Sequence, residues 1–553
     1  MGRGGRVTGA RLTQHIAALG PLRHKTFRQL WAASQVSNLG SLIQAVGAAW
    51  MMTNLTSSPS MIALVQASTT LPIMLFSLSA GALADSFDRR RIMLVAQCFM
   101  LVVSISLAAA AYANLLTPWT LLGFTFLIGV GTALNNPSWQ ASMGDIVPRQ
   151  DLPEAVSMNS MGFNLMRSVG PALGGIIVAL AGAAVAFAVN ALSYFPLLGA
   201  LLVWRPEPRL QSVPREPFMP AVAAGLRYVA MSPNLLRVML RGMVFGLGAV
   251  SVLALLPLIA RDLVQGGAFI YGVLLGCFGL GAIFGGLLNA RIRRMMRNEW
   301  VVRWAFAGFA AATLILSQST SLLVSVMPMM LAGASWVLAL SLFNVTVQLS
   351  SPRWVVGRAL AMYQMATFGG MAAGSWIWGA TAEVFGTHGA LLASGVFLLL
   401  GAVVGKQFEM PEFGTIDLDP LNSFIEPPLE LNLRGRSGPI LVMIDYQIDP
   451  ADIPVFLATM TERRRTRRRD GARHWALLRD LEHPDQWTES YHLATWDDYR
   501  RHNARRTNAD GIVSDQLLRL HRGAAPPQIH HMIERQSVYS HRDIQIKDGD
   551  APL

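Results

Sequence analysis

The sequence is poor in charged residues and in cysteine, and each shortage narrows the class of protein. Only 14% of the 553 residues are Asp, Glu, Lys or Arg, whereas a soluble domain carries about a quarter. Hydrophobic residues make up 52% of the chain and the mean hydropathy is +0.39, which indicates lipid as the main solvent. Both cysteines, Cys98 and Cys277, lie in apolar runs, so the sequence shows no disulfide framework.

Several other classes of function find little support. The sequence has no GxxxxGK[ST] loop, so ATP-driven transport has no motif. The net charge of +12 is weak evidence for nucleic acid, because much of the excess lies in short loops where membrane proteins keep cations in the cytoplasm. Most histidines lie after residue 470 without the spacing of a metal site. We expect no nucleic-acid partner, no metal and no cofactor.

Apolar runs long enough to cross a bilayer fill the chain up to residue 407. A transmembrane helix needs about 20 mainly apolar residues. The runs that meet this length are 28–54, 60–84, 92–114, 118–141, 155–178, 181–204, 235–260, 267–289, 299–319, 322–349, 357–381 and 386–407. The sequence therefore predicts a basic N-terminal tail (1–27), a six-helix bundle (28–204), an inter-bundle loop (205–234) and a second six-helix bundle (235–407).

Arginines gather in alternate loops between these spans. The arginine-bearing loops contain Arg89–Arg91, Arg149, Arg205–Arg227, Arg291–Arg297 and Arg353. In the other set, the loops at 54–60, 114–118, 181–184 and 317–321 carry no charge, and 261–262 and 383–388 hold its only charged residues. Because cations in short loops stay inside, we expect the arginine-rich loops and both termini on the cytoplasmic side of the inner membrane.

The two halves resemble each other at a fixed shift of 204 residues. The matching pairs are Gly81 with Gly285, Arg89 with Arg293, Pro148 with Pro352, Ala155 with Ala359, Met158 with Met362, Met161 with Met365 and Gly170 with Gly374. A common shift across two loops and a helix indicates a duplicated six-helix unit. In transporters with parallel repeats, the substrate site lies between the repeats.

The loop after the second span carries a charged signature, Gly81-Ala-Leu-Ala-Asp85-Ser-Phe-Asp-Arg89-Arg90. It resembles the cytoplasmic motif of the major facilitator superfamily, in which this cluster latches the cytoplasmic side shut. The resemblance implies a gating role for Gly81, Asp85, Arg89 and Arg90, and the glycine would let another helix approach closely. The alternative is an ordinary positive-inside loop. The second-half copy has Asn289 in place of the aspartate.

The fifth span holds the run Gly170-Pro171-Ala-Leu-Gly174-Gly175, which resembles an exporter-associated motif of the same superfamily. Small residues and a proline favour a helix that bends and packs closely, so these four residues are either a hinge or simple packing. Arg167 lies about 20 Å into this span, counted at 1.5 Å per residue. A buried arginine faces a partner or a wet cavity. It is either a substrate contact or half of a structural pair.

Other polar residues lie inside the predicted spans. Amides that face lipid lose their hydrogen bonds, so some line a central cavity and others bridge helices. Besides Arg167, the candidates for substrate binding are Asn164, Asn38, Gln35, Gln140, Asn344 and Gln364. No acidic residue lies clearly at mid-membrane, so the sequence does not display a proton carrier.

The chain ends in a polar region that differs from the rest. Residues 408–438 are predicted to be a linker. Alternating apolar residues from Ile440 to Ile448 then predict a strand, and the pattern continues as helix, strand, strand, helix, strand. This βαββαβ order predicts a ferredoxin-like domain at 439–535, followed by a tail at 536–553. The domain resembles those of the antibiotic-biosynthesis monooxygenase type, which usually dimerise.

Catalysis in this domain has weak support, because core packing explains Trp475 and Trp487 equally well. We therefore expect no catalytic residues. The basic run Arg463–Arg469 is either a solvated helix face or a docking surface for anionic lipid or acidic loops.

Taken together, these motifs and Asn135-Asn136-Pro137 resemble the transmembrane secretion effector branch of the major facilitator superfamily, which includes the enterobactin exporter. The resemblance implies an all-α membrane fold of twelve helices plus the α+β ferredoxin-like domain. It also implies export of a small molecule, such as a siderophore, drug or secondary metabolite, by alternating access with proton coupling. The alternatives are an uptake carrier and a membrane-tethered monooxygenase-like or sensor protein.

Overall fold

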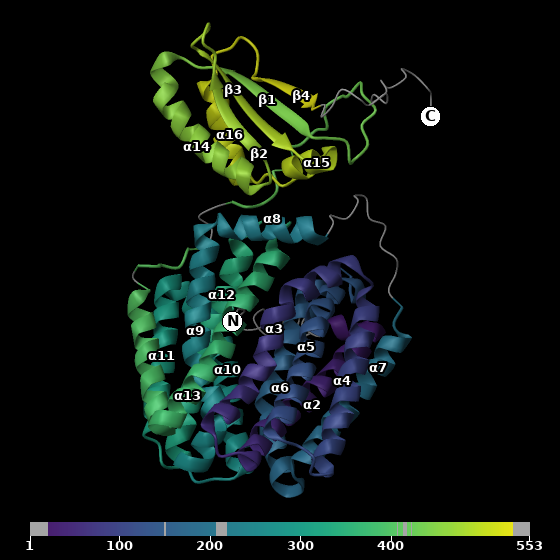
Figure 1. Ribbon diagram of the computed structural model, residues 1–553, viewed down its shortest axis with the longest axis vertical. Helices are drawn as coiled ribbons and strands as arrows, with labels where there is room; N and C mark the ends of the chain where they lie inside the picture. The colour runs from purple at the N-terminus through teal and green to yellow at the C-terminus, as the bar shows by residue number, and fades with distance from the viewer. Residues whose placement is uncertain are drawn as a thin grey trace, which may run out of the picture. The chain divides into compact units, whose positions relative to one another are not determined.

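The chain folds into two compact units in a computed structural model (Figure 1). The structure describes residues 20–148, 151–205, 218–405, 407–412, 417–421 and 423–534. Unit 1 comprises residues 1–218, 237–346 and 360–412, and unit 2 comprises residues 219–236, 347–359 and 413–553. Unit 1 is helical, whereas unit 2 contains a sheet.

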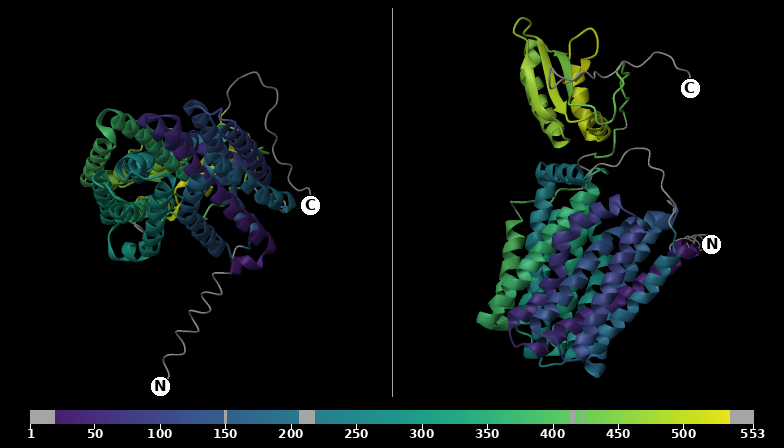
Figure 2. Two further views of the ribbon diagram at one scale, coloured as in Figure 1. Left: turned by 90° about the horizontal axis from the view of Figure 1, so that it is seen from below. Right: turned by 45° about the vertical axis from the view of Figure 1, so that its right-hand side comes forward.

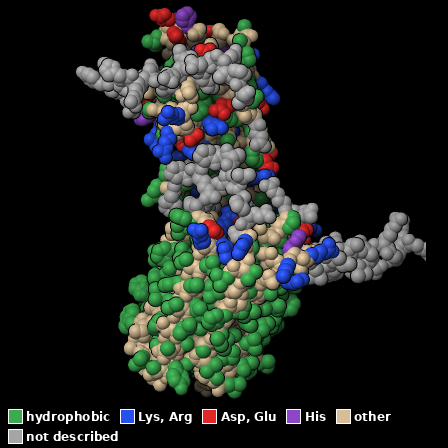
Figure 3. Space-filling view, turned by 90° about the vertical axis from the view of Figure 1, so that its right-hand side faces the viewer, with side chains coloured by type: hydrophobic (Ala, Val, Ile, Leu, Met, Phe, Trp, Pro, Cys, Tyr) green, Lys and Arg blue, Asp and Glu red, His purple; other side chains and the backbone are tan. Residues whose placement is uncertain are grey.

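Long helices that run side by side build unit 1 (Figures 1 and 2). Their bounds are η1 Gly20–Arg23, α2 Lys25–Leu55, α3 Pro59–Ser86, α4 Arg89–Tyr112, α5 Pro118–Ile146, α6 Leu152–Ala181, α7 Ala183–Val203, α9 Pro233–Leu258, η3 Ile259–Leu263, α10 Ala268–Met295, α11 Asn298–Ser317, α12 Leu322–Leu349 and α13 Val356–Val404. Within the described residues, ten helices are long and apolar enough to cross a membrane. Hydrophobic side chains dominate the flank of this unit and Lys and Arg gather at one end (Figure 3).

The last two predicted spans, 357–381 and 386–407, meet without a loop between them. They are two helices that share the label α13 and are separated by a kink at Gly386, where φ is 72°. That backbone conformation is readily adopted only by glycine. Gly182, between α6 and α7, has φ of 82°, and the two glycines are 204 residues apart (386 − 182). The turn of one half is thus repeated in the other. The count of twelve spans stays a prediction.

The predicted inter-bundle loop, 205–234, contains a helix. Residues Phe218–Ala230 form a helix, α8, whose apolar residues Ala221, Ala224, Tyr228 and Val229 are buried. Their spacing of three and four residues is that of an amphipathic helix. The segment is too short for a membrane span, and it belongs to unit 2 rather than to the bundles.

Unit 2 contains a four-stranded antiparallel sheet with the strand order β2-β3-β1-β4. The elements are β1 Ile440–Gln447, η4 Pro450–Asp452, α14 Ile453–Arg469, β2 Arg473–Arg479, β3 Gln486–Leu493, α15 Trp496–Ala504, α16 Asn508–Leu520 and β4 Gln528–Ile533. The predicted order of strands and helices is found, except that two helices stand where one was expected. Each has its own Thr N-cap, Thr495 and Thr507, whose side chains accept the backbone N–H three residues on.

The core of unit 2 encloses a carboxylate. Apolar side chains of β1 and the helices pack together around Phe456 and Tyr491, yet Glu489 on β3 is fully buried beside them. It accepts hydrogen bonds from Arg467 at 3.2 Å and from Trp475 at 3.0 Å. Burial alone would raise the pKa of Glu489, but the adjacent Arg467 and a second arginine hold the pKa below its ordinary value.

We expect Glu489→Ala to destabilise unit 2 by about 3–5 kcal/mol, because the arginines that surround the carboxylate would be left buried and uncompensated. Hydrogen exchange on the full-length protein checks this, with faster exchange expected across residues 440–534. The exposed Glu482→Ala is the matched control. Equal exchange in the two variants would contradict a structural role for Glu489.

Candidate functional site

The glycine-rich run of α6 lies between two other helices. A Cβ added at Gly170 would lie 2.8 Å from Leu42 of α2, and one at Gly174 would lie 3.1 Å from Ile43 of the same helix. A Cβ at Gly175 would instead meet Gly272 of α10 at 2.9 Å. Small residues let backbones approach this closely. The packing function predicted for this run is therefore visible, whereas a hinge function stays a prediction.

The contact of α6 with α10 joins the two halves of unit 1. A Cβ at Gly272 would lie 2.7 Å from both the Cα of Gly175 and the carbonyl oxygen of Pro171. Further along, a Cβ at Gly279 would lie 2.6 Å from the Cα of Ser168. We call this contact seam A. It leaves no room for a side chain at Gly272 or Gly279.

A second seam repeats the first at the 204-residue shift. Gly379 of α13 corresponds to Gly175 (379 − 175), and a Cβ there would lie 2.8 Å from Ala63 of α3. The same pair of helices is joined by a hydrogen bond from Ser77 Oγ to the carbonyl oxygen of Ala361, at 3.3 Å. We call this contact seam B. The halves of unit 1 are thus held by two contacts related by the internal repeat.

Arg167 lies on seam A and reaches into the opposite half. Its guanidinium carbon is 5.5 Å from the ring centroid of Phe278 on α10 and 5.7 Å from that of Trp336 on α12. No carboxylate among the described residues lies within ion-pair distance of it, and its side chain is partly exposed. Cation–π contacts of this kind fix a guanidinium without neutralising its charge. The ion or carbonyl pair considered from the sequence is not found in the described part of the chain.

The aromatic partners of Arg167 were missed by the sequence reasoning. Phe278 and Trp336 belong to a buried cluster from α9, α10, α11 and α12, in which Phe245 also contacts Trp336 at 6.1 Å between ring centroids. The other members are Phe306, Phe309 and Phe343. One or two aromatic residues on each of four separate apolar helices give no pattern in the sequence, so only the fold shows that they meet.

The polar residues predicted to bind substrate are spread over several helices. Gln35 is buried on α2 and its side chain packs against Gly162 of α6, two residues from Asn164. Asn164, Asn38, Asn344 and Gln364 are partly exposed, and Gln140 is exposed. Gln35 thus lies at the contact of α2 with α6, whereas Arg167 contacts α10 and α12, so the two share only helix α6. A common binding site for all six amides stays a prediction.

Another amide of α2, Gln44, bridges helices instead. Gln44 of α2 accepts hydrogen bonds from Ser104 of α4, at 3.3 Å, and from Asn190 of α7. Asn190 also bonds to the hydroxyl of Tyr194 at 3.2 Å. This buried network ties three helices of the first half together, which is the bridging role expected for some of the amides.

The predicted gating motif is anchored within the first half. Arg89 donates to Asp145 at 2.9 Å and to the carbonyl oxygen of Ala141 at 2.8 Å, both at the end of α5. Arg90 donates to two carbonyl oxygens at the C-terminal end of α7, at 2.7 and 2.8 Å, where cations are favoured. The side chain of Asp85 lies outside the described residues. The close approach expected at Gly81 is not seen, because a Cβ there meets no atom within 4 Å.

A buried ion pair in the second half was also missed. Glu299, in the first turn of α11, lies 3.3 Å from Arg241 of α9 and 2.8 Å from Arg303. It also accepts the backbone N–H of Met410 at 2.9 Å. Two signals were present in the sequence, namely Arg241 inside a predicted span and the acid four residues before Arg303. The group joins α9 and α11 to the chain that follows α13.

The basic run of α14 divides into two sets. Arg463 and Arg467 are buried and pair with Glu489, and Arg469 pairs with Asp470 at 2.9 Å. Arg464 and Arg468 are exposed. Neither sequence interpretation, a solvated face or a docking surface, describes the whole run. Residues four apart share a face of a helix, so Arg463 and Arg467 point into the core and Arg464 and Arg468 point outward.

The comparisons with known proteins agree with this architecture. The chain is 24% identical to the staphyloferrin A transporter of Staphylococcus aureus over 48% of this chain and 67% of that protein. It is 24% identical to macrolide efflux protein A of Streptococcus pyogenes, over 47% and 65% of the two chains. These alignments thus span about two thirds of each relative. An enterobactin exporter of Escherichia coli is 25% identical over 70% of this chain and 94% of that protein.

Solved structures share the fold at low sequence identity. A bacterial homologue of the human lysosomal transporter Spinster matches with a TM-score of 0.58 and 14% identity, over 71% of this chain and 99% of that chain. A nucleoside transporter matches with a TM-score of 0.58 and 12% identity, over 69% and 100%.

These findings first define the class. The chain is a multi-pass membrane transporter of the major facilitator type, a class of transporters and not of enzymes. Within that class it belongs to the transmembrane secretion effector family, whose sequence profile matches residues 16–539. The resemblance stated from the motifs is thereby confirmed at the family level.

We expect Gly272→Val to weaken seam A, because the added carbons would overlap the backbone of α6. Overpacking of this kind typically costs about 1–3 kcal/mol, so the purified protein should unfold at a lower temperature. Gly199→Val on α7 is the matched control, since a Cβ there meets no atom within 4 Å. Equal loss of thermal stability in both variants would show that the seam is not close-packed.

Proposed function

We propose that this chain exports a small molecule from the cytoplasm by alternating access of its two halves. The observation that carries the proposal is Arg167, which extends from the first half onto two aromatic rings of the second half. Three relatives, a staphyloferrin A transporter, a macrolide efflux protein and an enterobactin exporter, support export of a siderophore, drug or secondary metabolite.

Arg167 is the first candidate for holding the substrate. A guanidinium that no carboxylate of the described residues neutralises attracts an anionic or hydrogen-bond-accepting group. The adjacent rings of Phe278 and Trp336 would contact the apolar part of the same molecule. Asn164, on the same helix as Arg167, and Gln35, on the adjacent helix α2, would supply neutral hydrogen bonds. A substrate bound there touches both halves, so binding would be sensitive to their relative motion.

The seams and the gating motif would act as the moving parts. Arg89 and Arg90 fix the α3–α4 loop to the ends of α5 and α7, so the first half would move as one body. The open space at Gly81 is where another helix would close in the opposite state, as the motif predicts. Gly170, Pro171, Gly174 and Gly175 would permit sliding or bending of α6 against α2 and α10.

Orientation and coupling complete the proposal. The arginine-rich loops and both termini would lie in the cytoplasm, in line with the positive-inside rule. Proton coupling is the energy source that the family resemblance implies, with protons entering as the substrate leaves. Twelve spans would result if α2 crosses the membrane with the ten apolar helices and if α13 crosses twice around Gly386.

The sheet-containing part of unit 2 would be a cytoplasmic ferredoxin-like domain. Its strand order β2-β3-β1-β4 supports that topology, and its resemblance to the antibiotic-biosynthesis monooxygenase type suggests dimerisation. A catalytic role is disfavoured by the surroundings of its tryptophans. Trp475 donates to the buried Glu489 at 3.0 Å, and Trp487 packs on Phe456 in the core.

Direction of transport is tested by accumulation of a macrolide and of a catecholate siderophore in cells with and without this chain. Export predicts lower intracellular accumulation of at least one of them when the chain is present. Higher accumulation would instead identify an uptake carrier. A chemically altered compound would indicate that this chain, or an enzyme bound to it, modifies the compound.

The substrate role of Arg167 is tested in the same cells. We expect Arg167→Ala to lower the export rate by roughly tenfold, because charged hydrogen bonds typically contribute about 1.5–3 kcal/mol. Arg167→Lys should retain part of the rate, since it keeps the charge but not the planar fork. The exposed Arg294→Ala is the control for loss of one positive charge. Normal export by an Arg167→Ala protein that reaches the membrane would remove Arg167 from the site.

A further inference from the structure

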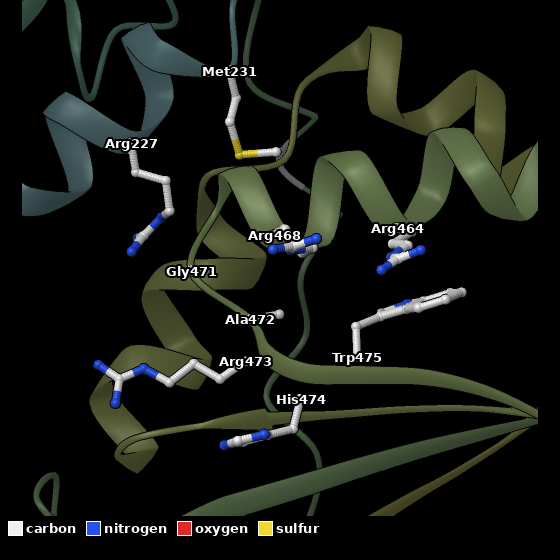
Figure 4. A pocket seen from close by; sticks show the side chains of 9 residues that line it. All are labelled: Arg227, Met231, Arg464, Arg468, Gly471, Ala472, Arg473, His474 and Trp475. Atoms are coloured by element: carbon white, nitrogen blue, oxygen red, sulfur yellow. The ribbon is translucent and has the colours of Figure 1, made fainter.

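Unit 2 contains a basic pocket that the transport proposal does not use. The cavity has a volume of about 510 Å³ and is lined by α8, the last turns of α14 and the start of β2 (Figure 4). A volume of this size is in the range of small-molecule sites. The charged or aromatic residues that line it are Arg227, Arg464, Arg468, Arg473, His474 and Trp475.

Cations dominate the lining of this pocket. Four arginines line it, and none of the described residues that line it is acidic. Two buried carboxylates of unit 2 are engaged by arginines that do not line it, because Glu489 pairs with Arg463 and Arg467 and Asp470 pairs with Arg469. The two sets of arginines on α14 therefore have different roles. One set of arginines neutralises the core, and the other set surrounds the pocket.

The arginines of the pocket are held in place by local contacts. Arg464 lies over the ring of Trp475, 5.6 Å from its centroid (Figure 4). Arg468 follows four residues later on the same face of α14. Arg227 reaches from α8 and donates through Nε to the carbonyl oxygen of Arg469 at 3.2 Å. These contacts orient the guanidinium groups of Arg464 and Arg227.

The backbone on the third side of the pocket is unusual. The pairing of β2 with β3 is irregular between Arg473 and Ala476, and His474 has φ of 48°. Gly471, just before, has φ of 113°, and a Cβ there would lie 3.1 Å from the guanidinium of Arg227. Strained backbone and bulges of this kind are enriched at binding sites. Here they bring consecutive residues of β2 to one cavity.

We propose that this pocket binds a ligand that carries a phosphate or diphosphate group. Guanidinium groups match phosphate oxygens in pairs, as planar forks of donors. Several arginines around one cavity suit a multiply charged anion better than a carboxylate, whose single charge one arginine can neutralise. Because α8 and the C-terminal domain both line the cavity, the bound ligand would hold α8 against that domain. The phosphate would come either from an anionic lipid headgroup or from a soluble phosphorylated metabolite.

The binding test uses the purified full-length chain in nanodiscs of phosphatidylcholine. Inorganic pyrophosphate is titrated and heat release is measured. We expect saturable binding, and an affinity lowered roughly tenfold by Arg464→Gln and by Arg468→Gln. Both side chains are exposed, so folding should be kept. Arg519→Gln removes one exposed arginine of α16 outside the pocket, and its affinity should stay within about twofold of the original.

A second arm distinguishes the sources of the phosphate. The same protein is placed in nanodiscs that contain phosphatidylglycerol, and hydrogen exchange is measured over residues 464–475. A lipid ligand predicts slower exchange there than in phosphatidylcholine, and the Arg468→Gln variant should lose the difference. A soluble ligand predicts slower hydrogen exchange over residues 464–475 with pyrophosphate but not with phosphatidylglycerol. The proposal is overturned if neither probe changes the protein, or if Arg519→Gln weakens binding as much as Arg468→Gln. Neither measurement depends on transport.

Discussion

Close backbone packing at the two seams is the constraint on which the helical unit depends. Without side chains at Gly175 and Gly272, α6 and α10 approach until backbone atoms touch, and the repeat places a similar contact between α3 and α13. In lipid there is no hydrophobic force between helices, so van der Waals contact and a few hydrogen bonds hold the halves. In the proposed alternating-access cycle, the same weakness would let the halves change their contact without unfolding. The same glycines would then serve both stability and movement.

Features that depend on local composition were predictable from the sequence. Span positions follow from apolar length, and the repeat follows from matched residues such as Gly170 and Gly374. The structure extends this repeat, because a Cβ at Gly170 meets Leu42 and a Cβ at Gly374 meets Val250 on the corresponding helix α9. The family followed from short motifs in loops. Sidedness and the count of twelve spans stay predictions. The length and composition of the helices show which could cross a membrane, but not which side is cytoplasmic.

Features that depend on tertiary contact were not predictable. The partners of Arg167 lie 111 and 169 residues away in the chain (278 − 167 and 336 − 167), and nothing near them in sequence marks them. Glu299 was overlooked because it begins a helix, where an acid is ordinary, yet it is buried against Arg241. Helix α8 was overlooked because its apolar stripe is only 13 residues long.

The arrangement of α14 has a consequence for how its arginines are studied. A common experiment replaces every cation of a basic segment at once and attributes the lost activity to lost charge. Here that replacement would strip Arg467 from a buried carboxylate as well as Arg468 from a solvent-facing cavity, and the protein would fail for two unrelated reasons. Substitution must follow the helical turn, one face at a time. A segment that looks uniformly basic in sequence thus contains two sets of arginines, which lie on different faces of one helix and have separate roles.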